Sequence, residues 1–202
     1  SLALGWRDFR RAPLYGLVFS AVYVLGGLLI TFAMTTKGQV WWTLPASAGF
    51  PILGPFIACG FYEISRRLEA GEPLVASEVF GVIFRQKDRQ IPAIAAVIVV
   101  YFLFWNFLSH MIFALFLGNA VMTNVSSSLA VFLSPQGLAM LGFGTLVGAA
   151  FATLLFCLTV VSLPMLLDRE VDFVTAMLTS FALVRENPGV MLGWGMLIAT
   201  SL

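Results

Sequence analysis

The chain has 202 residues, of which 60% are hydrophobic and only 10% are charged. A soluble domain typically has about 25% charged residues, so this composition excludes an ordinary water-soluble domain and favours a protein whose surface faces hydrocarbon. The formal net charge of +1 excludes a basic field over the whole molecule of the kind that attracts nucleic acid.

Apolar runs of about 20 residues predict helices that cross a bilayer. The chain contains four such runs and the beginning of a fifth, which predicts an all-α, polytopic transmembrane helical bundle: Leu14–Thr35, Thr43–Ser65, Pro92–Leu117, Gly137–Leu167 and Pro188–Leu202. The fifth run would rise only about 22 Å as a helix, which is too short to cross. We therefore expect five spans in this chain, and six in a longer protein of which the chain is a piece.

Short amphipathic segments lie between the apolar runs. Residues Leu2–Phe9, Val75–Ile83 and Phe173–Val184 each place apolar side chains at helical spacing. The last of these segments follows Asp172, which is suited to cap a helix N-terminus. Because a short helix with one apolar and one polar face lies in the plane of the membrane surface, we expect these segments to be interfacial helices between hairpins of spans.

Each interfacial segment ends in the same pattern, Arg-x-x-Pro, before the next apolar run. Proline suits the first turn of a helix, where its missing N–H is not needed, and a preceding arginine can extend to lipid phosphates. The pattern predicts a single transmembrane domain, residues 1–202, built from hairpin repeats at about 1–88 and 89–184 and a third, truncated repeat from 185. It also predicts anchors at the membrane surface: Trp6, Arg10, Arg11, Arg89 and Arg185.

Basic residues are distributed unevenly between the links that join the runs. Ten of the eleven lie before the first run or in the links after the second and fourth runs, and only Lys37 lies in the other set of links. Because lysine and arginine are enriched in cytoplasmic links, this bias predicts a cytoplasmic N-terminus. The predicted location is a bacterial inner membrane, which the chain crosses several times.

Three stretches beside the apolar runs resemble a known family. They are GFYEISRRLEAGEP at Gly60–Pro73, VSLPMLLDREVDFVTAMLTS at Val161–Ser180 and ENPGVML at Glu186–Leu192. Together they are similar to an uncharacterised bacterial family of integral membrane proteins, domain of unknown function 2189. The resemblance implies a polytopic inner-membrane protein of six helices, and it supplies no catalytic or binding residues that could be transferred to this chain.

His110 is the single histidine of the chain and lies near the middle of the third run, close to Asn106 and Ser109. At helical spacing these three side chains share one polar stripe, which makes them candidate binding residues. Such side chains inside a bilayer either hydrogen-bond a neighbouring helix or mark a path for substrate or protons. An imidazole can also bind the metal of a haem or chlorophyll, and the sequence leaves these interpretations open.

Two further features also allow a site. Glu63 lies about one helical turn before Arg66 and Arg67, so it either pairs with them at the inner interface or belongs to a coupling or headgroup-binding site. In the fourth run, Gly144 and Gly148 form a small-xxx-small pair, which predicts close packing with a neighbouring helix.

The sequence lacks the residue combinations of common enzymes. With one histidine, two cysteines inside apolar runs and no pair of convergent carboxylates, it predicts no catalytic residues, no metal site and no cofactor. We therefore expect a non-enzymatic accessory or scaffold subunit of a larger membrane complex. Its expected partners are the lipid bilayer and another membrane protein or a second copy, and no nucleic acid. The alternative is a small-molecule or lipid transporter with a midplane site near His110.

Overall fold

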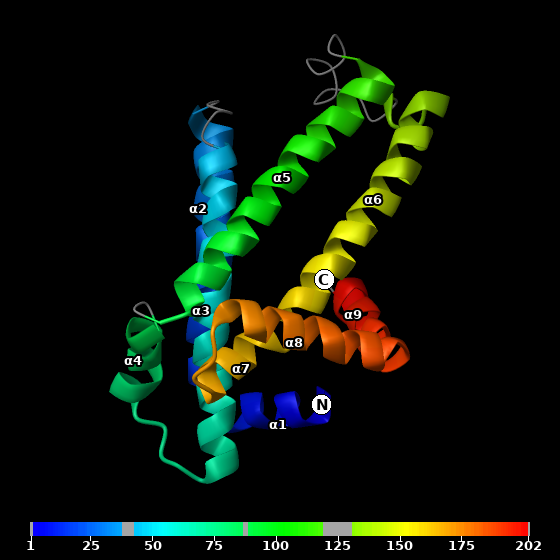
Figure 1. Ribbon diagram of the computed structural model, residues 1–202. Coiled ribbons are helices and arrows are strands. Elements are labelled where there is room, and N and C mark those ends of the chain that lie inside the picture. Colours follow the sequence, from blue (N-terminus) through cyan, green and yellow to red (C-terminus); the bar gives the residue numbers. More distant parts are fainter. Residues whose placement is uncertain (1, 38–42, 87–88, 119–130, 202) are drawn as a thin grey trace.

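A computed structural model describes residues 2–37, 43–86, 89–118 and 131–201 (Figure 1). These residues fold into α-helices joined by short links, which confirms the predicted all-α class. In chain order the helices are α1 Leu2–Arg11, α2 Pro13–Lys37, α3 Thr43–Ala70, α4 Ala76–Gln86, α5 Ile91–Leu117, α6 Pro135–Thr159, α7 Ser162–Asp168, α8 Phe173–Glu186 and α9 Pro188–Ser201. The three segments predicted as interfacial helices correspond to α1, α4 and α8.

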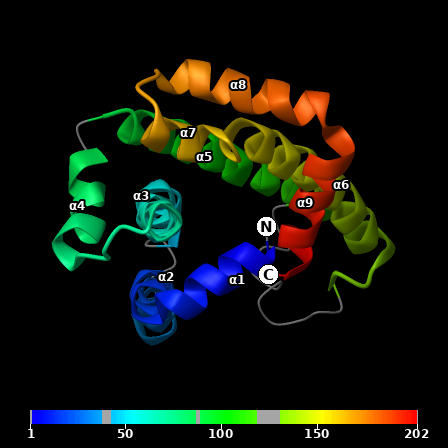
Figure 2. The same ribbon diagram turned by 90° about the horizontal axis from the view of Figure 1, so that it is seen from below.

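Helix α3 has the most neighbours. It packs against α2 and α5 and contacts the shorter helices α1, α4 and α7, while α6 packs against α5 and α8. In Figures 1 and 2, the short helices α1, α4, α7 and α8 all lie near one end of the long helices. All arginines of the described residues lie in the short helices α1, α4 and α8, in the last turns of α3, or in the links just before α5 and just after α7. The charged links therefore gather at one end of the molecule, which we call the charged end.

Two helical segments are long and apolar enough to cross a membrane: α5, and the 34-residue segment Pro135–Asp168 that α6 and α7 form together. A third is obtained if α1 and residues Pro13–Leu29 of α2 count as one span, although the chain bends by 104° between them. Helix α9 has only 14 residues, and α3 becomes charged near its end. The described residues thus give a multi-pass protein with two or three candidate spans, and the count of five stays a prediction.

The three Arg-x-x-Pro patterns mark junctions between a short helix and the next one. Pro13 and Pro188 are the first residues of α2 and α9, and Pro92 lies in the first turn of α5. Since the first N–H groups of a helix have no intrahelical acceptor, proline costs no hydrogen bond there. The pattern therefore accounts for where these helices begin, and the repeat that it suggests stays a prediction.

Two clusters of buried apolar side chains hold the helices together at the charged end. One joins five helices through Cys59, Val82, Ile91, Ile94, Leu166 and Ala176. The second joins α2, α3 and α4 through Ala12, Phe19, Ile57, Ile64 and Val79. The second cluster requires glycine at one position, because a Cβ at Gly60 would lie 2.3 Å from the ring of Phe19. Many large apolar side chains of α2, α5 and α6 are instead exposed, as expected for helices that face lipid.

The junction of α6 and α7 is a break in a helix, and a side chain from α8 bridges it. In a continuous helix the Val161 N–H would donate to the Cys157 carbonyl. Here the Val161 N–H donates to the hydroxyl of Ser180 at 3.1 Å, and that hydroxyl donates to the Cys157 carbonyl at 2.7 Å. Ser180 has no exposed surface, and its hydroxyl replaces both halves of one helical hydrogen bond. It thereby fixes α8 against the junction.

Helix α8 packs through small side chains. Its predicted N-cap is confirmed, because the carboxylate of Asp172 accepts a hydrogen bond of 2.9 Å from the Thr175 N–H. The side chains that it buries are Ala176, Ser180 and Val184. Large apolar side chains of the predicted apolar face remain exposed: Val174, Leu178 and Phe181. This arrangement suits a surface helix whose apolar face meets lipid.

Candidate functional site

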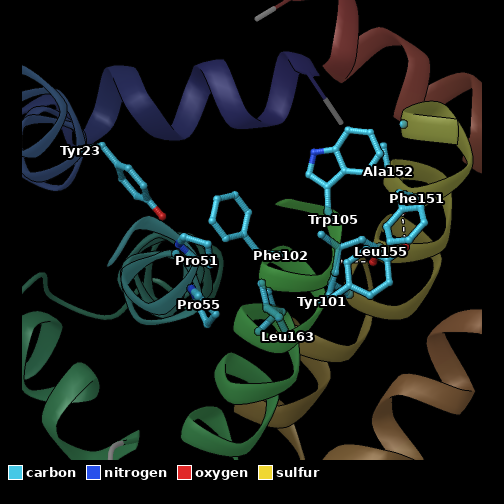
Figure 3. A pocket seen from close by; sticks show the side chains of 14 residues that line it. Tyr23, Pro51, Pro55, Tyr101, Phe102, Trp105, Phe151, Ala152, Leu155 and Leu163 are labelled. Atoms are coloured by element: carbon cyan, nitrogen blue, oxygen red, sulfur yellow. Dashed lines mark hydrogen bonds between the residues drawn. The ribbon is translucent and has the colours of Figure 1, made fainter. Parts of the chain in front are cut away.

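Helices α3, α5 and α6 line an apolar cavity of about 740 Å³, to which α2 and α7 contribute single side chains (Figure 3). Pro51 and Pro55 line the wall formed by α3, while Tyr101 and Trp105 of α5 and Phe151 of α6 line the opposite side. Helix α3 continues through both prolines. Because neither proline has an N–H, neither can donate to the carbonyl four residues before it, so α3 lacks two internal hydrogen bonds beside the cavity.

Polar groups are few in the lining, and two of them already have partners within the protein. The Tyr101 hydroxyl donates to the Phe151 carbonyl at 2.8 Å, and the Thr159 hydroxyl donates to the Leu155 carbonyl at 2.7 Å. The rings of Tyr101 and Phe151 also pack together, with centroids 5.0 Å apart. The cavity therefore suits an apolar occupant, which it would recognise mainly by shape.

A second apolar cavity, of about 560 Å³, lies between α5 and α6. The two cavities share the lining residues Trp105, Gly148 and Ala152, so they adjoin each other, and we call the two together the α6 groove. Along α6 its lining extends from Met140 to Thr159, which is 19 steps of the helix or about 28 Å. That length is close to the thickness of the hydrocarbon core of a bilayer, about 30 Å.

The two glycines predicted to promote helix packing lie in this groove. A Cβ at Gly148 would lie 3.1 Å from the ring of Trp105, so the absence of a side chain there lets α5 and α6 approach. At Gly144 the nearest side chain is that of Ile112, 3.9 Å from such a Cβ. Together with Ala152, these glycines form a strip of small residues along one face of α6, and all three line the second cavity.

The polar stripe predicted on α5 forms no connected site. His110 Nδ1 lies 2.7 Å from the Asn106 carbonyl, and the Ser109 hydroxyl donates to the same carbonyl at 2.8 Å. The amide of Asn106 donates to the Phe102 carbonyl at 3.0 Å. All three side chains are thus bonded to the backbone of their own helix. Ser109 lines the second cavity, whereas His110 is exposed and lines neither cavity of the groove.

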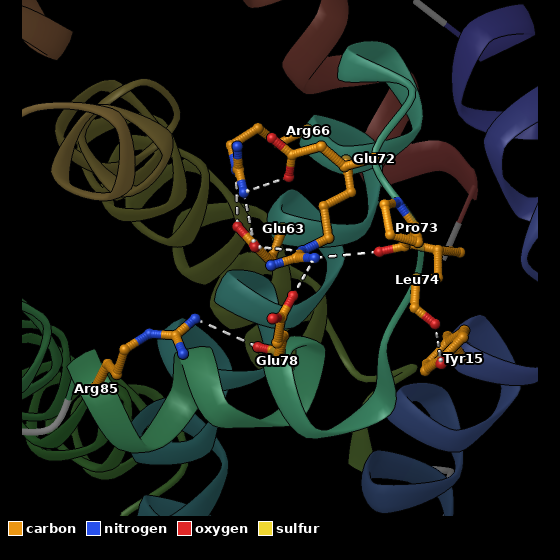
Figure 4. Close-up of polar contacts among 9 residues, drawn as sticks. Tyr15, Glu63, Arg66, Glu72, Pro73, Leu74, Glu78 and Arg85 are labelled. Carbon is orange, nitrogen blue, oxygen red and sulfur yellow. Dashed lines mark hydrogen bonds and ion pairs between the residues drawn. The ribbon is translucent and has the colours of Figure 1, made fainter.

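Glu63 lies in a cluster of ion pairs at the charged end of α3 (Figure 4). Arg66 donates two hydrogen bonds of 2.9 Å to its carboxylate, and Arg67 donates a third of 2.7 Å. Arg67 also pairs with Glu78 of α4 and donates to the Pro73 carbonyl at 3.1 Å. Hydrogen bonding to Glu63 raises the pKa of both arginines above the ordinary value. The cluster therefore fastens α4 and its preceding link to the end of α3.

The predicted anchors occupy different surroundings. Three are exposed on α1 and line one hollow: Trp6, Arg10 and Arg11. Arg89 forms an ion pair of 3.2 Å with Glu170, and Arg185 is exposed in the last turn of α8. The structure thus brings the anchors of α1 together and leaves the other two on separate elements.

Several residues of the groove and its supports were not among the predicted site residues. They are Tyr101, Trp105, Phe151, Ala152 and Ser180. Spacing distinguishes none of these aromatic residues from the many others in the apolar runs, because their role depends on a second helix. In the sequence, the groove is indicated by the glycines of α6, which line it, and by the prolines of α3, which line its opposite wall.

Comparison with known proteins gives one family match. Residues 43–168 match a family model described as a predicted integral membrane protein, DUF2189. The matched region runs from α3 to α7, so it contains the walls of the α6 groove on α3, α5 and α6 and leaves out α1 and α8. No curated protein and no solved structure matches the chain.

Proposed function

The chain belongs to the DUF2189 family of predicted integral membrane proteins, and on this premise we propose that it is a non-enzymatic accessory or scaffold subunit of a larger membrane complex. In this proposal the α6 groove receives a transmembrane helix of a partner protein. The observation that carries the proposal is the groove itself, which is apolar, bordered by small residues and nearly as long as the hydrocarbon core is thick.

A helix suits this groove because small residues let its backbone approach closely. Inside lipid, two apolar surfaces gain little from leaving their solvent, so helices associate mainly through van der Waals contact. Gly144 and Ala152 leave room for that contact along one face of α6, while Gly148 between them packs against the ring of Trp105. Trp105 stands beside this strip and offers a large rigid surface to an incoming helix.

We further propose five spans, formed by α2, α3, α5, the α6–α7 segment and α9, in a bacterial inner membrane with the N-terminus in the cytoplasm. The gathering of arginines at the charged end supports this orientation, because cytoplasmic links are rich in basic residues. Helices α2 and α3 have 25 and 28 residues, which is long enough to cross. Helix α9, with 14 residues, would cover only part of the bilayer within this chain.

The non-enzymatic role rests on the sequence. The chain has a single histidine and no motif that pairs a nucleophile with a base or holds a catalytic metal. Glu63, the other ionisable candidate, is bonded to Arg66 and Arg67. The proposal accordingly includes no cofactor and no nucleic acid partner.

Filling the groove tests the proposed function. Ala152→Trp would place a large ring where the partner helix is expected to lie, and Leu146→Trp is the matched control, because Leu146 is exposed on the same helix and lines neither cavity. After extraction in mild detergent, the unaltered protein and the control should migrate in a larger assembly with a co-purifying membrane protein. Ala152→Trp should lower the affinity for that partner by about tenfold or more, which corresponds to about 1.4 kcal/mol.

A monomer in mild detergent whose migration is unchanged by Ala152→Trp would overturn the proposal. If that monomer moved a solute or a lipid between the two sides of a liposome, the result would support the transporter alternative. The route would then be the α6 groove, since His110 lies outside both of its cavities.

A further inference from the structure

Helix α1 turns away from α2 by 104° and presents one charged side outward. It contacts α2 and α3, and Asp8 is its buried side chain, so the side that carries Asp8 faces the protein. Trp6 and Arg10 are each two residues from Asp8, which places them about 200° around the helix from it. They therefore lie on the side of α1 that faces away from α3.

A hollow of about 490 Å³ runs along α1 from this outward side toward Arg7 and Arg11, which lie nearer to Asp8 around the helix. Its lining consists of Ala3, Trp6, Arg7, Arg10 and Arg11. Asp8 lies 3.4 Å from Arg7, whereas no carboxylate of the described residues pairs with Arg10 or Arg11. The hollow is therefore a cationic site with one aromatic wall.

The aromatic wall is held in place by packing. Trp6 is 63% exposed and stacks on Phe9, with ring centroids 5.6 Å apart. Phe9 in turn lies against α2, where a Cβ at Gly16 would come within 2.7 Å of its ring. Because Phe9 fixes the position of the indole, Trp6 keeps a large apolar surface exposed beside the guanidinium groups. Tryptophan beside arginine is the combination found at the level of lipid headgroups.

We propose that this hollow binds the headgroup of an anionic phospholipid. In this arrangement Arg10 and Arg11 donate hydrogen bonds to the lipid phosphate, and Trp6 inserts beside the upper part of the acyl chains. The occupant is a lipid because the site combines cationic donors with an exposed apolar ring, and a free anion would use only the donors. The occupant is anionic because the hollow has two arginines whose charge no described carboxylate compensates.

Titration of detergent-solubilised protein with phosphatidylglycerol or phosphatidylcholine, followed by native mass spectrometry, tests this assignment. The test variant combines Arg10→Gln with Arg11→Gln and keeps the contact between Arg7 and Asp8. The matched control combines Arg85→Gln with Arg169→Gln, which removes the same charge from exposed positions that are not among the predicted anchors.

The unaltered protein should bind phosphatidylglycerol more tightly than phosphatidylcholine. Each arginine near an anionic lipid surface contributes a factor of about five in affinity, so the test variant should bind phosphatidylglycerol about 25-fold more weakly. The control should keep its affinity within about a factor of five of the unaltered protein. Equal affinities for the two lipids, or equal losses in the two variants, would overturn the proposal. Displacement of the lipid by millimolar inorganic phosphate would also overturn it, because the site would then be an anion site.

A second measurement does not depend on charge. Brominated acyl chains quench tryptophan fluorescence at short range. The difference in quenching between the unaltered protein and Trp6→Phe gives the contribution of Trp6. We expect this part to be substantial in vesicles of phosphatidylglycerol. Absence of any Trp6 contribution would contradict an indole that inserts beside the acyl chains.

Discussion

The two halves of the molecule attach their surface helices by different chemistry. In the first half, α4 contributes Val79 and Val82 to the apolar clusters, and its polar attachment comes from charged groups, chiefly Arg67, which bonds both Glu63 and Glu78. In the second half, α8 is held by the neutral hydroxyl of Ser180, which is inserted into the break between α6 and α7.

This difference in chemistry follows from how far each attachment site is exposed to water. Arg67 and Glu63 are nearly buried, but their partners Arg66 and Glu78 have side chains that are 49% and 50% exposed, so the cluster reaches solvent. Ser180 has no exposed surface, and the backbone groups that it satisfies lie at the junction of α6 and α7, where Cys157 and Ser162 are also buried. Where no water can take over a hydrogen bond, a neutral group that both donates and accepts costs less to bury than a pair of charges.

The largest effect is expected from Ser180→Ala. The substitution removes the partner of the Val161 N–H and of the Cys157 carbonyl at once, and an unpaired buried polar group costs about 1–3 kcal/mol. We expect unfolding to occur roughly 5–10 °C lower, measured by intrinsic fluorescence in detergent. The control is Thr179→Ala, since the exposed Thr179 hydroxyl bonds only within its own helix. Equal, small shifts in unfolding temperature for both variants would mean that the Val161 N–H and the Cys157 carbonyl bond each other directly without Ser180. The proposed difference between the two halves would then be wrong.

An intermediate effect is expected from Glu63→Gln. The substitution removes the carboxylate that Arg66 and Arg67 share, and partial exposure of the cluster reduces the cost to about 1–2 kcal/mol. Unfolding should occur roughly 3–6 °C lower, and Glu69→Gln, at an exposed position of the same helix, should change little. Because salt at about 1 M shortens the screening length to about 3 Å, the effect should shrink in salt while that of Ser180→Ala should not. If salt reduced the effects of Glu63→Gln and Ser180→Ala equally, the distinction between a charged and a neutral attachment would be wrong.

The smallest effect is expected at the N-cap of α8. The hydroxyl and the N–H of Thr175 donate to Asp172 and lower the pKa of its carboxyl below the ordinary value. A lowered pKa means that the carboxylate stabilises the folded state fully above its ordinary pKa and loses this effect as the pH falls through the lowered value. Asp172→Asn keeps the cap and removes the charge, so it should lower the unfolding temperature by roughly 1 °C at neutral pH. The difference should vanish in acid, and a difference that grew in acid would contradict this assignment.

Local features of the fold could be predicted from the sequence because each depends on neighbouring residues. Asp172 caps α8 through groups three residues away. The prolines begin helices because the N–H that proline lacks is not needed in the first turn. The side of α8 that meets the protein could not be predicted. In lipid, a large apolar side chain gains little from facing protein, so Phe181 stays outside and the small Ser180 goes inside.

The candidate site was less predictable than the fold. Gly144 and Gly148 indicated a close helix contact, and both line the α6 groove. The polar stripe of His110 could not be interpreted from spacing, because the backbone of α5 itself satisfies those side chains. The walls of the groove come from helices that are far apart in the sequence, so no local pattern contains them.

The position of the two buried clusters has a mechanical consequence. Both clusters lie at the charged end, so the short helices and the adjoining turns of the long ones form a packed base, and farther along α5 and α6 contact each other through rings such as those of Phe116 and Phe143. A thicker or thinner bilayer changes the tilt of helices that are too long or too short for it. A change in helix tilt about the packed base would alter the width of the α6 groove. The affinity of the groove for its occupant would then depend on the thickness of the surrounding membrane.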